Sequence, residues 1–140
     1  MIFLDTNVLV AATQVTHPHN QRSRALLATT TGVEAVIAAH TLAELYSSLT
    51  SIRPPERISP QVAMQALEAY LLRMTPITLT TDEYLRAIRD AANRGHIGGM
   101  IYDALLLACA RKSKADFIYT WNIKHFQAIA PDLADRIITP

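Results

Sequence analysis

The chain has 140 residues, of which 50% are hydrophobic and 18% are charged. This composition is typical of a folded protein and excludes a disordered one, and the length predicts a single domain over residues 1–140. The formal net charge of +1 excludes a strong overall attraction to nucleic acid. A phosphate-binding surface would therefore have to be a local cluster of donor groups.

The sequence shows no pattern for secretion or for membrane insertion. No basic segment precedes the first apolar run, and Asp5 interrupts that run after four residues. No apolar stretch approaches the ~20 residues that a membrane helix requires. The only cysteine, Cys109, lies in the apolar run ALLLACA, where a core position is expected and no disulfide framework can form. We therefore expect a cytoplasmic protein without a membrane partner.

Five short apolar runs predict β-strands, and segments with helical periodicity separate them. Strands that alternate with helices pair in parallel through right-handed crossovers. The sequence therefore predicts a three-layer α/β/α sandwich with a mostly parallel sheet of four or five strands. The expected strands cover residues 2–4, 35–38, 77–79, 117–119 and 136–138.

Two of the expected helices carry clear boundary residues. Ser59 before Pro60 is typical of an N-cap followed by the first helical residue. Thr80 and Glu83 have the spacing of a capping box, and Gly95 is placed to end that second helix. An apolar stripe is expected on the first of these helices at Val62, Ala66, Leu67 and Tyr70.

An acidic residue, Asp5, directly follows the first expected strand. In open sheets of this class, ligands bind beyond the carboxyl ends of the strands, at the point where the strand order reverses. If the first strand is central, residues that follow the second and fourth strands would lie beside Asp5. Polar groups that share a site with Asp5 are therefore expected at those two places.

Glu44 lies in the first turns after the second expected strand. Leu42, Leu45 and Leu49 share one helical face, which leaves Glu44 on another side together with His40. Taken alone, Glu44 is more often an ordinary solvent-facing residue. Its place after the second strand makes it a candidate for the same site as Asp5.

Asp103 lies in an apolar helical segment, and its neighbours three and four positions away are Gly99, Met100, Leu106 and Leu107. An ionised carboxylate in such surroundings costs several kcal/mol unless hydrogen bonds or a cation compensate it. A metal ion is the first interpretation. The alternative is that Asp103 is the N-cap of its helix.

Asn122 falls at the end of the fourth expected strand, close to Thr120. An amide or hydroxyl there can ligate a hard cation directly or through water, and the alternative is a turn Asn beside an N-capping Thr. Trp121 between them either packs at the rim, which is the more common case, or stacks on a base. His17 and His19 are a weak zinc signal, because two imidazoles have no third soft ligand nearby, and they could instead contact a phosphate.

Four segments resemble the signature blocks of PIN-domain ribonucleases, especially the VapC-type toxins of bacterial toxin–antitoxin pairs. They are FLDTNVLV, AELYSSLT, GGMIYDALLLACA and YTWNIKHF, and their order and spacing carry the resemblance. The resemblance implies that Asp5, Glu44 and Asp103 hold the catalytic metal. It places Asn122 at the family's fourth position, which is often Asp.

The chemistry of these residues agrees with that resemblance. Oxygen ligands suit Mg²⁺ or Mn²⁺, and a cation held by the three acids would activate a water for attack on an RNA phosphate. Thr6 and Asn7 would hydrogen-bond the ligands, as would Thr120. The attraction of RNA to this acidic site would then depend on the metal and on nearby Arg or Lys side chains.

The resemblance also implies two protein partners. A cognate antitoxin would block the acidic crevice with a basic residue, and the toxin would be a homodimer. In the sequence, only the apolar segment Tyr70, Leu71 and Leu72 suggests a surface for self-association.

Two other functions remain open from the sequence. In a phosphatase-like hydrolase Asp5 would be the nucleophile, but that design usually has a second acid two residues later, where this chain has Asn7. In a non-catalytic nucleic-acid-binding module, Asn122 would mark a site that has lost its activity.

Overall fold

Five strands form one parallel sheet in the computed structural model, which describes residues 1–30 and 34–140. The strand order is β3-β2-β1-β4-β5, so β1 is central and the sheet winds outward in both directions from it. The strands are β1 Ile2–Leu4, β2 Ala35–Ala38, β3 Met74–Ile77, β4 Phe117–Tyr119 and β5 Ile137–Ile138.

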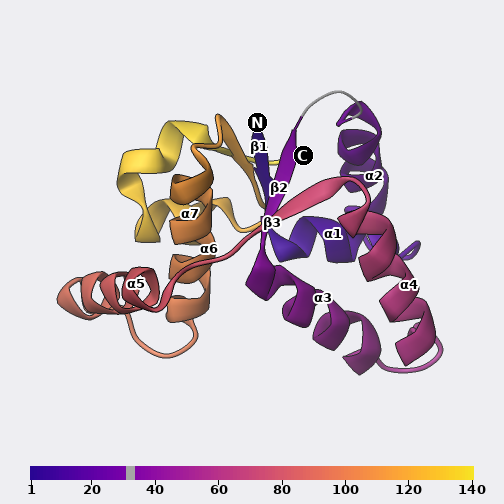
Figure 1. Ribbon diagram of the computed structural model, residues 1–140. Coiled ribbons are helices and arrows are strands. Elements are labelled where there is room, and N and C mark those ends of the chain that lie inside the picture. The colour runs from indigo at the N-terminus through magenta and orange to yellow at the C-terminus, as the bar shows by residue number, and fades with distance from the viewer. Residues whose placement is uncertain (31–33) are drawn as a thin grey trace.

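Helices cover both faces of this sheet, as Figure 1 shows. Side chains of β1 alternate between the two faces: Phe3 belongs to one buried cluster, whereas Ile2 and Leu4 belong to the other. The cluster around Ile2 and Leu4 packs under α1 Thr6–Thr13, α2 Asn20–Thr29, α3 Ala39–Ser51 and α4 Pro60–Leu71. The cluster around Phe3 packs under α5 Thr81–Asn93, α6 Met100–Ser113, α7 Ile123–Ile129 and the 3₁₀ helix η1 Pro131–Arg136. The expected three-layer α/β/α sandwich is confirmed.

The third strand lies earlier in the chain than predicted. It spans Met74–Ile77 and pairs with β2 at the edge of the sheet, whereas the sequence predicted 77–79. The strand contains Pro76, whose missing N–H is tolerated on an edge strand but weakens the sequence signal there. At the other edge, β5 begins at Ile137 rather than at residue 136, because η1 extends to Arg136.

The predicted helix boundaries are confirmed. The Ser59 side chain accepts a hydrogen bond from the Val62 backbone N–H at 3.2 Å, and Pro60 is the first residue of α4. Thr80 caps α5 in the expected capping box with Glu83, and a left-handed Gly95 follows that helix. The predicted stripe on α4 was partly wrong, because Val62 is 49% exposed while Leu67 is buried.

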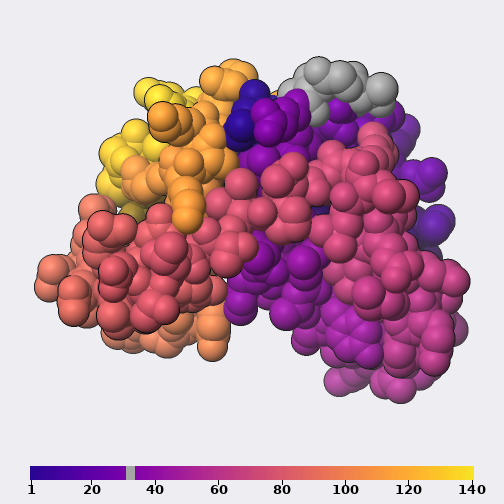
Figure 2. All heavy atoms as spheres, in the orientation of Figure 1, coloured from indigo at the N-terminus to yellow at the C-terminus, as the bar shows by residue number. Residues whose placement is uncertain are grey.

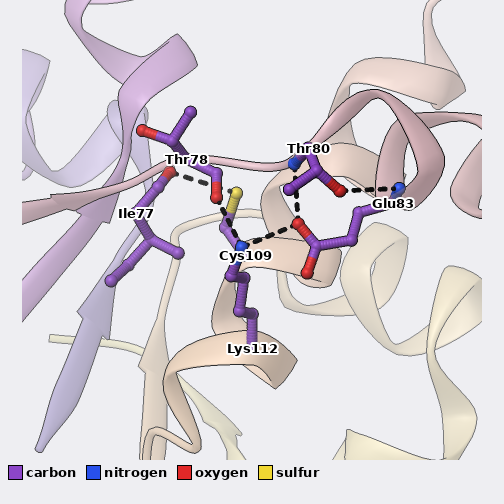
Figure 3. A network of polar contacts seen from close by, with 6 residues as sticks. All are labelled: Ile77, Thr78, Thr80, Glu83, Cys109 and Lys112. Carbon is purple, nitrogen blue, oxygen red and sulfur yellow. Dashed lines mark hydrogen bonds and ion pairs between the residues drawn. The ribbon is translucent and has the colours of Figure 1, made fainter.

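A polar network fastens α6 to the segment that joins β3 to α5 (Figure 3). The Lys112 ammonium donates to the Thr78 carbonyl at 2.9 Å and to Glu83 Oε2 at 2.7 Å. Cys109 Sγ lies 3.5 Å from the Ile77 carbonyl, and burial raises the pKa of its thiol to about 11. Cys109 is therefore an inert core residue, as the sequence predicted.

None of the helices in the described part of the chain is long and apolar enough to span a bilayer.

Candidate active site

Asp5 stands at the carboxyl end of the central strand, which is the position the sequence predicted. Its side chain is buried, and the Thr120 hydroxyl at the end of β4 donates to Asp5 Oδ2 at 2.6 Å. Burial raises the pKa of Asp5 to about 7; the negative charges of Asp103 and Glu44 add to the rise, and the Thr120 hydrogen bond opposes it. The surroundings of Asp5 therefore favour its neutral, protonated form over the carboxylate.

Glu44 reaches the same region from the second turn of α3. The Thr6 hydroxyl, at the start of α1, donates to Glu44 Oε2 at 2.5 Å and lies 3.2 Å from the buried hydroxyl of Thr41. The other carboxylate oxygen, Oε1, lies 3.4 Å from His40 Nε2. Only 28% of the Glu44 side chain is exposed, so the interpretation as an ordinary solvent-facing residue is wrong.

Asp103 approaches from the opposite side of the sheet, in the first turns of α6. The N-cap of that helix is Gly99, so the interpretation of Asp103 as an N-cap is wrong. Its Oδ2 lies 2.8 Å from His125 Nδ1, which comes from α7. Burial raises the pKa of Asp103, and His125 opposes that rise while Glu44 adds to it.

Thr120 and Asn7 join the ends of β1 and β4. Thr120 Oγ1 accepts hydrogen bonds from Asn7 Nδ2 at 3.2 Å and from the Asn122 backbone N–H at 2.9 Å. Asn7 Oδ1 in turn accepts from the Trp121 backbone N–H at 3.1 Å. The local turn expected as an alternative for Asn122 is thus present, but Thr120 is not a helix cap, because the N-cap of α7 is Asn122. The turn coexists with a position of Asn122 in the lining of the site.

The three acids Asp5, Glu44 and Asp103 line one hollow of about 610 Å³. Figure 2 shows the molecular surface indented between α3 and the segments of α5 and α6. No Arg or Lys lies among the described residues that line the hollow, so the basic side chains expected beside the acids are not part of its wall. Its lining is Asp5, Thr6, Asn7, Val10, His17, His40, Ala43, Glu44, Ser47, Ser48, Tyr102, Asp103, Leu106 and Asn122.

The donor chemistry of the hollow fits a divalent cation. Asp5, Glu44 and Asp103 are like charges in one partly buried space. The charges of Asp103 and Glu44 add to the rise in the pKa of Asp5, and the charge of Glu44 adds to the rise in the pKa of Asp103. The electrostatic cost of such like charges is relieved by protons or by a cation, and oxygen donors suit a hard one. As the side chains of residues 1–30 and 34–140 are oriented in this structure, however, no three His, Cys, Asp or Glu residues form a group that could hold an ion.

Three residues of the site were not singled out from the sequence as acting there. His125 contacts Asp103, while His40 contacts Glu44 and stacks on Tyr102 with ring centroids 5.5 Å apart. The spacing of four residues between His40 and Glu44 is a detectable helical signal. His125 has no such signal, because its contact depends on how α7 packs against α6.

Trp121 packs within the protein, as the more common interpretation predicted. Its indole Nε1 donates to the buried Ser23 hydroxyl at 3.0 Å, and His19 stacks on the ring at a centroid distance of 3.8 Å. The Arg22 guanidinium lies 5.1 Å from the ring centroid. These contacts engage His19 with Trp121 instead of with a metal.

The chain belongs to the PIN-domain family, because the model of that family matches residues 2–130. Ribonuclease VapC40 of Mycobacterium tuberculosis is 35% identical over 119 residues, which are 84% of each chain. The predicted membership in this family is confirmed.

Solved structures share the fold. The Mycobacterium tuberculosis toxin VapC20, described as cleaving the sarcin–ricin loop, superposes with a TM-score of 0.76 at 19% identity, over 91% of this chain and 95% of that one. VapBC2 of Rickettsia felis, bound to DNA from its promoter, gives a TM-score of 0.67 at 23% identity, over 100% and 98%. FitAcB of Neisseria gonorrhoeae gives 0.66 at 23% identity, over 100% and 97%.

Proposed function

We propose that this PIN-domain protein is a metal-dependent endoribonuclease and the toxin of a toxin–antitoxin pair. The observation that carries the proposal is the convergence of Asp5, Glu44 and Asp103 from three separate elements on one hollow at the carboxyl ends of the strands. The similarity to ribonuclease VapC40 over 84% of the chain supports RNA as the substrate class.

The three carboxylates would hold the metal, which we propose to be Mg²⁺ or Mn²⁺. When bound, such an ion supplies an activated water and offsets the negative charge that develops on the phosphate oxygens. The chain's own part is to fix the carboxylates. Thr120 holds Asp5, and Thr6 holds Glu44, each through a donated hydrogen bond.

With Asn122 at the fourth position, which is often Asp in the family, the negative charge of the proposed site comes from three carboxylates and not from four. The Asn122 backbone N–H donates to the Thr120 hydroxyl oxygen, and the residue lines the hollow without adding charge. The neutral amide would position water or substrate beside the acids.

A cognate antitoxin and a second copy of the chain are the proposed protein partners. The structural similarity to the VapBC2 and FitAcB assemblies supports the antitoxin. A basic side chain of the antitoxin placed in the hollow would neutralise the same three acids and exclude the metal. For the homodimer, the support is the apolar end of α4, where Leu71 is 41% exposed and Leu72 is 89% exposed.

The two rival functions fit the geometry less well. An attacking aspartate must be accessible and ionised, whereas Asp5 is only 4% exposed and its pKa is raised to about 7. A module that binds nucleic acid without a metal needs cationic side chains, and none lines the hollow in the described part of the chain.

The test is to incubate the purified protein with tRNA and rRNA in Mg²⁺, in Mn²⁺ and in EDTA. Cleavage is expected with either metal and not in EDTA, and it should disappear in Asp5→Asn. Glu68→Gln provides the matched control, because Glu68 is an exposed carboxylate on α4 outside the hollow. Cleavage that persists in EDTA or in Asp5→Asn contradicts the mechanism.

A further inference from the structure

His17 lines the same hollow as the three acids but comes from a different part of the molecule. It lies in the connection between α1 and α2, and it is partly buried. The other histidine in the lining, His40, contacts Glu44, and His125 beside the hollow contacts Asp103. Among these three described imidazoles, His17 is the one without a carboxylate partner.

One hydrogen bond defines which nitrogen of His17 carries the proton. The His19 backbone N–H donates to His17 Nδ1 at 3.1 Å, so Nδ1 is an acceptor without a proton. In a neutral imidazole the proton then resides on Nε2, which becomes a donor. Partial burial and the neighbouring His19 lower the pKa of His17, which favours this neutral form.

The same hydrogen bond excludes His17 as a metal ligand in this arrangement. A neutral imidazole that ligates a metal through Nε2 must carry its proton on Nδ1 and donate it. Here Nδ1 already accepts an N–H from His19. His17, which lines the hollow, therefore has an N–H donor at Nε2 and no free lone pair on its ring.

The segment around His17 is held firmly. The Asn20 side chain donates to the carbonyls of Ala11 and Ala12 at 2.8 and 3.1 Å, which ties the connection to the end of α1. The His19 ring stacks on Trp121 with planes 8° apart. A donor fixed in this way loses little conformational freedom when it binds a ligand.

The hollow needs such donors because its wall contains three acids and no Arg or Lys among the described residues. A nucleic-acid backbone is positioned mainly by hydrogen bonds to phosphate oxygens, and uncharged donors take part in them. We propose that His17 Nε2 donates a hydrogen bond to a backbone phosphate oxygen of the RNA substrate and so forms a substrate subsite beside the metal site. This inference rests on the proposed ribonuclease function and extends it to a specific substrate contact.

Two conservative variants separate this role from a structural one. In His17→Gln the amide nitrogen replaces Nε2, which keeps the donor but removes the acceptor of the His19 N–H. In His17→Asn the amide oxygen replaces Nδ1, which keeps the acceptor but removes the donor. Binding of fluorescein-labelled random-sequence single-stranded RNA is measured by anisotropy in the full-length protein without the Asp5 substitution, with Ca²⁺ in place of Mg²⁺ and with intact RNA verified on a gel. Cleavage of tRNA and rRNA is measured in the same background with Mg²⁺.

A substrate contact predicts that His17→Asn weakens RNA binding about tenfold, the effect of one hydrogen bond to a charged group. His17→Asn should also raise KM with little change in kcat, and His17→Gln should restore most of the affinity. Calorimetry should show the same Mn²⁺ affinity in both variants and in the unsubstituted protein. Unchanged RNA binding in His17→Asn, a loss in His17→Gln alone, or a loss of Mn²⁺ affinity overturns the inference.

The two proposals fail in different ways. If the unsubstituted protein cleaves RNA and His17→Asn leaves its KM unchanged, the subsite is wrong while the ribonuclease stands. If the unsubstituted protein neither binds nor cleaves RNA, both proposals are wrong.

Discussion

The two ends of α6 carry charge in opposite ways. Near its C-terminus Arg111 pairs with Asp132 and Lys112 pairs with Glu83, and these partners lower the pKa of both carboxyl groups. Near its N-terminus burial raises the pKa of Asp103, and the negative charge of Glu44 adds to the rise. Paired surface charges contribute modestly to stability, whereas clustered like charges oppose folding. We therefore assign the acidic end of α6 to the proposed active site and the basic end to the stability of the fold.

The largest expected difference between the two ends is in catalysis. Asp103→Asn should lower RNA cleavage about a thousandfold, because the loss of a metal ligand removes several kcal/mol of transition-state stabilisation. Glu83→Gln, on α5 beside the C-terminal end of α6, should leave cleavage unchanged, since Gln also completes a capping box. Rates of tRNA and rRNA cleavage in Mn²⁺ check both variants. Equal effects of the two substitutions would remove the distinction between the ends.

A second difference is expected in the pH dependence of stability without metal. The pKa of Asp5 rises from 3.8 to about 7 on folding, so the folded state holds the proton more tightly than the unfolded state. The free energy of unfolding should then fall between about pH 4 and pH 7, by a few kcal/mol, and stay low above pH 7.

The Asp5→Asn variant should lose this dependence, because its amide does not titrate. Urea unfolding in EDTA at several pH values between 5 and 8 measures the slope in both proteins. A parallel pH profile in the two would show that Asp5 does not carry the cost assigned to it.

The smallest expected effect is at the basic end. Lys112→Met removes the contacts to Thr78 and Glu83 seen in Figure 3. It should lower the free energy of unfolding only slightly, since solvent screens the exposed ion pair. Thermal unfolding measures the loss. Mn²⁺ affinity should stay the same, and a loss of Mn²⁺ affinity would mean that the two ends of α6 are coupled.

The sequence was sufficient for those parts of the fold that local patterns encode. Asp5 at the end of a buried strand, the cap at Ser59 and the capping box at Thr80 each depend on a few neighbouring residues. The position of β3 was missed, because Pro76 hides an edge strand whose register is determined by pairing with β2. The contact of His125 with Asp103 also depends on the packing of α7 against α6, which no local spacing reveals.

The roles of the predicted ligands stay a prediction. The structure places Asp5, Glu44 and Asp103 in one hollow together with Asn122. It also pairs two of the acids with histidines, a feature that could not be read from the acids themselves. Metal binding would have to compete with those contacts.

Calorimetric titration of the metal-free protein with Mn²⁺ tests most directly whether the carboxylates of Asp5, Glu44 and Asp103 bind one cation together. We expect saturable binding accompanied by proton release near pH 7, because Asp5 must lose its proton to become a ligand, and we expect no binding in Asp5→Asn, Glu44→Gln or Asp103→Asn. Unaltered Mn²⁺ binding in any one of these variants, or no binding by the unsubstituted protein, would contradict the account.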